Sequence, residues 1–231
     1  DMALLEAAVR DDLNKKAIRV SAVLDPVKLV ITNYPEGKTE EMEAINNPEN
    51  EADGTHTITF SRNLWIERDD FRQDPPKKYH RLAPGAEVRL RYAYFITCRE
   101  AVYDDAGNLV ELRCTYDPES RGGQSPDGRK VKGTIHWVSA AHCVDAEVRL
   151  YDKLFTEANM NGIPEGSDYK DYLNPESVTV RTGCKLEESL KDAKPGEKFQ
   201  FVRTGFFTPD SKNPGVYNRV VTLRDSFKPA K

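Results

Sequence analysis

A strict alternation of apolar and polar side chains runs through the segment VRLRYAYFITC, from Val88 to Cys98, and constrains the fold more than any other stretch of this chain. A period of two places Val88 and Ile96 on one face of a β-strand. Arg89 and Arg91 then share the opposite face. Two arginines fixed on a rigid sheet can bind the phosphates or base edges of an RNA. A solvated strand face is the alternative, and this segment taken alone favours it.

Composition limits what such a site can do. The chain has 231 residues with 38% hydrophobic content, enough to build one large domain or two small ones. Its formal net charge of −4 argues against a protein that binds nucleic acid through bulk positive charge. Basic residues nevertheless concentrate between positions 77 and 91, and acidic residues between positions 36 and 53. Any contact with RNA is therefore expected to be local.

The sequence points to a cytoplasmic protein without membrane contact. No apolar run approaches the roughly 20 residues that a membrane helix needs, and the N-terminal DMALLEAAVRDD lacks the features of a signal peptide. The four cysteines are scattered and form no CxxC pair, which indicates neither a zinc site nor a disulfide framework. Reduced thiols in the cytosol fit this pattern, and no metal site is expected.

The periodicities predict a mainly β protein with a short N-terminal helix, made of two antiparallel β-barrels. Apolar spacing predicts the helix at residues 3–10, fading before Asn14. Polar segments at 35–54, 117–130 and 156–175 are expected to be loops. Strands are expected at 20–24, 27–31, 55–60, 64–67, 87–103, 109–116, 131–140, 146–150, 176–183, 198–204 and 215–224.

The segment WVSAAHC, Trp137 to Cys143, looks like the surroundings of the catalytic histidine in trypsin-like serine proteases. A nucleophilic serine in a GDSGG pattern is missing, and so is the partner cysteine just upstream of His142. We therefore reject the protease interpretation. Ser139 and His142 are expected at a strand end and a turn, with His142 as a structural histidine. No catalytic residue is assigned in this chain.

Collinear motifs cover nearly the whole chain and together resemble one family. They are LDPVKLVITNY, FSRNLWIERDDF, YHRL, EVRLRYAYFI, DGRKVKGTIHWVSAAH, EVRLYDKLF, LNPESV and PGEKFQFVRTGFF, in that order between residues 24 and 207. This succession resembles the C-terminal anticodon-binding region of bacterial-type glutaminyl-tRNA synthetases. The match depends on the order of the motifs, because no single motif is specific enough.

The resemblance implies two β-barrels similar to the barrel of the ribosomal protein that binds 5S rRNA. Residues 1–17 would be a remnant of a helical connector. Residues 18–50 and 145–231 would form the barrel proximal to a catalytic domain, and residues 51–144 the distal barrel. The strands between Val20 and Ile31 would then pair with strands beyond Glu147, a non-local closure.

The resemblance also implies that this chain is the non-catalytic part of a class I enzyme. We find no HIGH-like or KMSKS-like motif and no Gly-rich turn that could hold ATP. The parent protein would ligate glutamine to its tRNA with ATP and Mg²⁺, while this part would need no cofactor. Its partners would be the anticodon loop of tRNA(Gln) and the catalytic domain of the same polypeptide, in a monomer.

Site residues are carried over motif by motif. The resemblance assigns the pocket for the middle anticodon base to Arg19, Gln200 and Arg203, the third base to Arg81, and the first base with its phosphate to Arg89 and Arg91. A glutamine amide can donate to and accept from uracil at once, and the arginine fork of Arg81 suits the O6 and N7 atoms of guanine. Alternation places Gln200 on one face of a strand and the apolar Phe199 and Phe201 on the other, core-facing side. Arg203 would also face the core, unless the strand bulges or ends before it.

Lys78 and His80 stand where relatives more often carry Gln and Lys, and they are equally consistent with RNA contact or an exposed loop. Two other functions stay open. One is the equivalent domain of an archaeal or eukaryotic-type glutamyl-tRNA synthetase, against which the pair Gln200 and Arg81 argues. The other is a stand-alone structural RNA-binding module of the 5S RNA kind.

Overall fold

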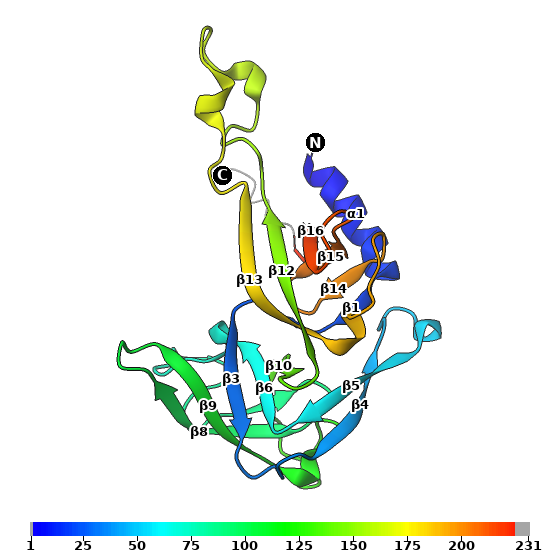
Figure 1. Cartoon of the computed structure of the whole chain (residues 1–231), viewed down its shortest axis with the longest axis vertical. Helices are drawn as coiled ribbons and strands as arrows, with labels where there is room; N and C mark the ends of the chain where they lie inside the picture. The colour runs from blue at the N-terminus through cyan, green and yellow to red at the C-terminus, as the bar shows by residue number, and fades with distance from the viewer. Residues whose placement is uncertain (1, 225–231) are drawn as a thin grey trace.

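The computed structural model describes residues 2–224, and it is mainly β with one α-helix at its N-terminus, as the sequence predicts. Two seven-stranded sheets and a two-stranded ribbon contain all the strands of this part of the chain. In Figure 1 the first sheet and the helix occupy the upper half of the molecule, and the second sheet with the ribbon occupies the lower half. Within residues 2–224, no helix is long and apolar enough to cross a membrane.

The helix α1 spans Met2–Lys16 and is longer than expected. Leu13 in its last turns is buried in a small cluster with Phe206 and Val221 of the first sheet, which anchors the helix along its side. Lys15 and Lys16 lie in its last turn, where positive charge is favourable to the helix dipole. Tertiary packing therefore carries the helix past Asn14, where its apolar periodicity fades.

The first sheet joins strands from both ends of the chain. Its spatial order is β1-β14-β15-β16-β12-β13-β2, mostly antiparallel but with parallel pairs β1–β14 and β12–β16. The rings of Phe201 and Phe207 stack in its core with centroids 4.1 Å apart. Its strands are β1 (Ile18–Val20), β2 (Ala22–Val23), β12 (Cys143–Tyr151), β13 (Val178–Glu187), β14 (Phe199–Phe201), β15 (Gly205–Pro209) and β16 (Val216–Thr222).

The second sheet has the order β10-β7-β8-β9-β3-β6-β11, with parallel pairs β10–β7 and β3–β9. Phe60 on the ribbon is fully buried against Tyr34, Tyr94 and Trp137, with ring centroids 5.1–5.2 Å apart. Its strands are β3 (Pro26–Ile31), β6 (Asn63–Glu67), β7 (Glu87–Leu90), β8 (Phe95–Tyr103), β9 (Leu109–Tyr116), β10 (Thr134–Ile135) and β11 (Val138–Ser139).

Strand β4 (Thr39–Ile45) forms the ribbon with β5 (Thr55–Ser61), so the expectation of a loop over 35–54 is wrong for its middle part. Met42 and Ala44 are buried and alternate with exposed glutamates, a pattern that the acidic composition hides. Short 3-10 helices occupy several loops: η1 (Glu51–Asp53), η2 (Arg68–Asp70), η3 (Pro118–Ser120), η4 (Met160–Gly162), η5 (Tyr169–Tyr172) and η6 (Glu188–Leu190).

The chain passes between the sheets earlier than the predicted division at residue 50. Strand β3 pairs with β6 and β9 of the second sheet, so only β1 and β2 of the N-terminal strands pair with strands beyond Glu147. The crossing falls at Leu24 and Asp25, whose backbone N–H groups both donate to the carboxylate of Glu67. Asp25-Pro26 interrupts the strand there, and Pro26 begins a strand of the other sheet.

The predicted strand 87–103 is a β-hairpin. Strands β7 and β8 pair antiparallel, with Val88 opposite Ile96, and the chain reverses between Leu90 and Tyr94. Tyr92 in this turn has a φ of +64°, a conformation uncommon for a residue with a side chain. The turn preserves the burial of Val88 and Ile96. Arg89 and Arg91 remain neighbours along one edge, because their N–H groups donate to the carbonyls of Gly133 and Ile135.

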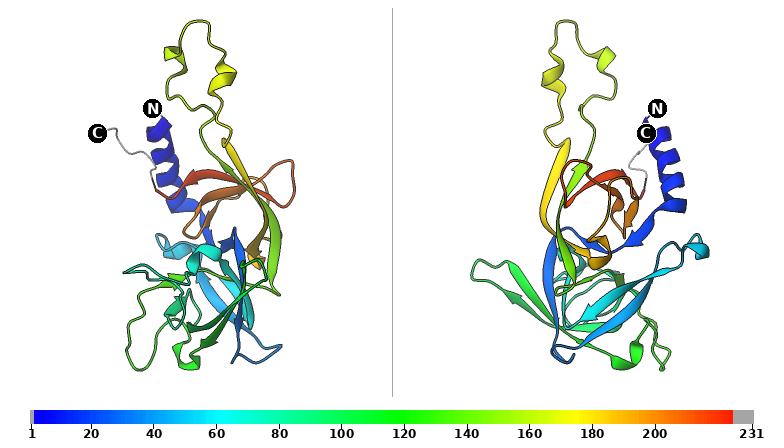
Figure 2. Two further views of the ribbon diagram at one scale, coloured as in Figure 1. Left: turned by 90° about the vertical axis from the view of Figure 1, so that its left-hand side faces the viewer. Right: turned by 45° about the vertical axis from the view of Figure 1, so that its right-hand side comes forward.

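Two further strand predictions need correction. The segment 131–140 forms only the short strands β10 and β11, separated by His136 and Trp137. Strand β15 was not predicted, because its mixture of Gly, Phe, Thr and Pro lacks alternation. Figure 2 shows that the chain between β12 and β13 projects from the first sheet, on the side away from the second sheet.

Candidate nucleic-acid interface

An open hollow of about 640 Å³ lies where the two sheets meet, and arginines dominate its lining. Arg81 and Arg91 come from the second sheet and its loops, and Gln200 and Arg203 come from the first sheet. These are four of the eight residues that the sequence singles out. Thr204, Thr222, Leu223, Val202 and Arg224 complete the lining.

Arg203 crosses from the first sheet to the second. Strand β14 ends at Phe201, and Arg203 lies in the following turn with a φ of +68°. Its Nη1 lies 2.9 Å from Oδ2 of Asp70, and its Nη2 lies 2.5 Å from Oδ1. The strand therefore ends before Arg203. Strand alternation no longer applies to this residue, and its side chain can point away from the core.

Asp70 is the centre of this arrangement, although no sequence motif singles it out. Its carboxylate is fully buried and contacts two predicted arginines, because Arg81 Nη1 also lies 3.3 Å from Oδ1. Burial by itself would lower the pKa of Arg203, but the hydrogen bonds and the charge of Asp70 outweigh it and raise that pKa. In the sequence ERDDF nothing local distinguishes Asp70 from its neighbour Asp69.

Gln200 lies beside Arg19, since the two are Cα partners in the parallel pair β14–β1. Phe199 and Phe201 point into the core, as the alternation predicts, and Gln200 is half-buried on the other face. Within residues 2–224 the Gln200 amide makes no hydrogen bond. Its donor and acceptor are therefore both available to a ligand that enters the hollow.

Arg19 lies beside Gln200 and binds the C-terminal end of α1. Its side chain is only 5% exposed, and its Nη1 and Nη2 donate to the carbonyls of Ala17 and Asn14, both at 2.7 Å, at the end of α1. Burial lowers the pKa of Arg19, and the charge of nearby Arg91 lowers it further. Arg19 therefore closes the helix C-terminus and backs the pocket with a charge, while its hydrogen bonds go to the protein.

Arg91 is held by the turn that breaks the predicted strand. Its guanidinium lies 4.9 Å from the ring centroid of Tyr92, and the Trp137 indole N–H donates to its carbonyl at 2.9 Å. No carboxylate forms an ion pair with it within residues 2–224. Arg224 also lines the hollow, and the sequence analysis missed it because nothing in the motif matching reaches that position.

Lys78, His80 and Arg89 lie outside this hollow. Lys78 and His80 are exposed on the loop that leads to Arg81, and Lys78 has a φ of +67°. Arg89 lines a separate hollow with Phe95 and Gly123. Arg89 and Arg91 stay two residues apart along one ladder, with their N–H groups donating to the carbonyls of Gly133 and Ile135, but their side chains line different hollows. The resemblance implies that both lie at the first anticodon base.

The protease-like segment forms two unrelated contacts. The buried Ser139 Oγ lies 2.6 Å from Ser61 Oγ, which joins strand β11 to the end of the ribbon. His142 lies in the turn after β11, and its Nδ1 is 3.4 Å from Glu188 Oε2. Both residues therefore hold elements together, as expected for a strand end and a turn.

Glu67 links the sheets beneath the hollow. Its carboxylate accepts the backbone N–H groups of Leu24 and Asp25 at 2.8 and 3.1 Å, and His136 Nε2 lies 3.8 Å away. Burial alone would raise the pKa of Glu67, but His136 and these two N–H donors outweigh it and lower the pKa below its usual value.

This shift predicts a pH dependence of stability. A carboxyl whose pKa is lower in the folded than in the unfolded state stabilises the fold above its unfolded value, and that contribution is lost as the pH falls through the folded pKa. We expect the free energy of unfolding to fall less steeply for Glu67→Gln than for the wild type between about pH 5 and about pH 3. Urea unfolding across that range measures it. Glu176→Gln, at an exposed position, should keep the wild-type slope.

Comparison with known proteins shows the family of the chain. Two family models, both described as the anticodon-binding domain of class I tRNA synthetases (E and Q), match residues 17–117 and 134–210. The chain belongs to this family. Each model covers residues of both sheets, so the family match runs through the junction that holds the hollow.

The similar curated proteins are glutamine–tRNA ligases. The chain is 51% identical over 230 residues to that of Nitrobacter winogradskyi, 50% over 234 residues to that of Clostridium kluyveri, and 51% over 231 residues to that of Pseudomonas putida. These alignments cover 98–99% of this chain. The chain spans about 40% of the length of these relatives.

Proposed function

We propose that this chain binds the anticodon loop of tRNA(Gln) as the anticodon-binding part of a glutamine–tRNA ligase. The names of the relatives favour glutamine over glutamate. The observation that carries the proposal is the hollow between the sheets, where the free amide of Gln200 lies among the guanidinium groups of Arg81, Arg91 and Arg203. Cations attract the phosphates of the loop, and an amide with both functions free can read a base edge.

The roles follow the contacts. Gln200 reads the middle uridine, with Arg203 beside it and Arg19 as the charge behind the pocket. Arg81, oriented by Asp70, reads the third base, which is a guanine in a glutamine anticodon, through the two acceptors of its edge. Arg91 contacts the first base or its phosphate. Lys78 and His80 contribute from the loop before Arg81 when the RNA is bound.

We infer the rest of the protein's activity from its relatives. The whole protein ligates glutamine to tRNA(Gln) with ATP and Mg²⁺, which bind in a catalytic domain outside these 231 residues. It acts in the cytoplasm as a monomer. The catalytic domain is the second partner of this chain. It binds the tRNA at a second site, and two linked sites give the whole protein a higher affinity than either site alone.

The test is binding of the chain to two anticodon stem-loops at two salt concentrations. One loop carries a glutamine anticodon, and the other has its middle uridine replaced by cytidine. We expect tighter binding to the first loop, with an affinity that falls as salt rises because phosphate contacts release counterions. Equal affinity for the two loops would contradict base-specific anticodon recognition by this chain.

A further inference from the structure

A second hollow, of about 470 Å³, lies beside the loop between β9 and β10. Three of the basic side chains that line it are Arg89, Lys130 and Lys132. Within residues 2–224 none of these three forms an ion pair or a side-chain hydrogen bond. Unpaired cations around one open space are the chemistry that binds an anion.

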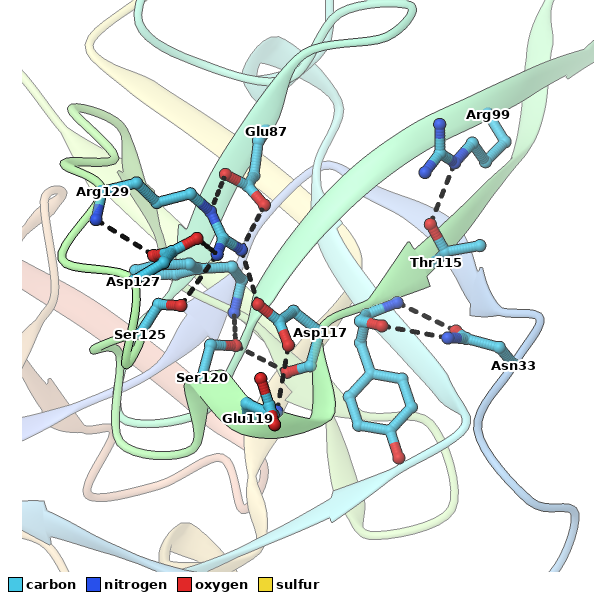
Figure 3. Close-up of polar contacts among 12 residues, drawn as sticks. Asn33, Glu87, Arg99, Thr115, Asp117, Glu119, Ser120, Ser125, Asp127 and Arg129 are labelled. Atoms are coloured by element: carbon cyan, nitrogen blue, oxygen red, sulfur yellow. Dashed lines mark hydrogen bonds and ion pairs between the residues drawn. The ribbon is translucent and has the colours of Figure 1, made fainter.

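Arg129 explains why these charges stay free. Its guanidinium binds Glu87 through two bonds of 3.0 and 2.9 Å, Asp117 at 2.6 Å and Asp127 at 2.7 Å (Figure 3). The carboxylates nearest the loop are therefore already engaged. They also fix the loop to strand β7, which carries Glu87.

The loop then presents its lysines outward. Exposure alternates along the segment, with Arg129 and Val131 half-buried and Lys130 and Lys132 exposed. Lys132 precedes β10, which pairs in parallel with β7 and places Thr134 beside Arg89. This register brings Lys132 close to Arg89, and both lysines line the hollow with the arginine.

Arg89 is oriented but chemically unsatisfied. Its guanidinium lies 5.4 Å from the ring centroid of Phe95, and its Nε is buried without a hydrogen-bond partner. Its stem lies against Gly123, where an added Cβ would come within 2.8 Å of Arg89 Cδ. The glycine therefore leaves room for an arginine whose terminal nitrogens have no protein acceptor.

Arg89 of this hollow is close along the chain to Arg91 of the proposed base-reading hollow. Arg89 and Arg91 are two residues apart on an extended segment, whose N–H groups at these positions donate to the carbonyls of Gly133 and Ile135, so their Cα atoms are about 6.6 Å apart. Such a spacing is comparable to that of consecutive phosphates along a single strand of RNA. An RNA strand that leaves the base-reading hollow past Arg91 would reach Arg89 next.

We propose that Arg89, Lys130 and Lys132 bind a backbone phosphate of the RNA strand next to the anticodon bases. This site rests on the proposed function and extends it by a phosphate contact that carries no base specificity. It assigns the loop 121–132 to the RNA interface. Its new element is the pair Lys130 and Lys132, which join the phosphate contact that the resemblance implies for Arg89.

The test uses the salt dependence of binding. The double variant Lys130→Ala/Lys132→Ala should bind the glutamine stem-loop about three- to tenfold more weakly at low salt. The slope of log affinity against log salt should become shallower by about 0.7 to 1.4, the contribution of one or two single-strand phosphates. Discrimination against the loop with the replaced middle uridine should be unchanged. The matched control, Lys191→Ala/Lys194→Ala, removes the same charge from exposed positions outside both hollows.

A slope and affinity equal to those of the control variant would overturn the phosphate site, even if the wild type still distinguishes the two loops. Absence of that discrimination in the wild type would instead overturn the proposed function, and the two failures are thus separable. Titration with inorganic phosphate alone provides a third arm. Saturable phosphate binding that is lost in the lysine variant, with RNA affinity unchanged, would assign the hollow to a free anion and overturn the proposal.

Discussion

Replacing Asp70 with asparagine is expected to lower the free energy of unfolding by about 2 to 3 kcal/mol. Removing one partner of a buried ion pair costs about 3 to 5 kcal/mol, because the other charge loses its compensation. Here the cost is smaller, since the Arg203 side chain is 32% exposed and the new amide still accepts one hydrogen bond. Urea unfolding measures the change through the transition midpoint.

The same substitution should weaken reading of two bases at once. Asp70 binds Arg203 and Arg81, which we assign to the middle and third anticodon bases. Discrimination at both positions should therefore fall together, while discrimination at the first position persists. Stem-loops with single base replacements measure each position. A loss confined to one position would contradict the shared role of Asp70.

Asp69→Asn is the matched control for this prediction. Asp69 is the preceding residue, its side chain is 85% exposed, and it approaches Arg72 no closer than 3.9 Å. Exposed pairs of this kind contribute little to stability. We expect the unfolding free energy and the RNA discrimination of this variant to match those of the wild type within about 0.5 kcal/mol.

Replacing Gln200 with alanine is expected to weaken binding of the glutamine stem-loop by about 1 to 3 kcal/mol, the cost of a lost base contact. Binding of the loop with the replaced middle uridine should change little, because that contact is already absent there. Stability should change by less than about 0.5 kcal/mol, since the amide has no partner in residues 2–224. A double-mutant cycle between the protein substitution and the base replacement measures the coupling.

Gln73→Ala provides the control, because Gln73 is exposed and lies outside the two hollows that we assign to RNA. Both stem-loops should bind this variant as they bind the wild type. If Gln200→Ala instead weakened both loops equally, its amide would contact the RNA backbone, and the middle-base assignment would be wrong.

Local sequence patterns determined the strands that follow clear alternation. Residues 55–60, 64–67 and 109–116 are strands as predicted, and Gln200 lies opposite the core-facing Phe199 and Phe201. These predictions succeeded because a period of two reports directly which side chains a pleated strand buries. The motifs, in their order along the chain, likewise determined the family by themselves.

The tertiary structure decided which elements meet. Strand β3 belongs to the second sheet, and the side chains of Arg89 and Arg91 line different hollows. Asp70 joins Arg203 across 133 residues of sequence. Alternation shows only that a strand buries one face, and it does not identify the strand beside it or the charge at its end. Those contacts depend on non-local pairing, whose energy comes from the partner's position in space, and only the folded chain specifies that position.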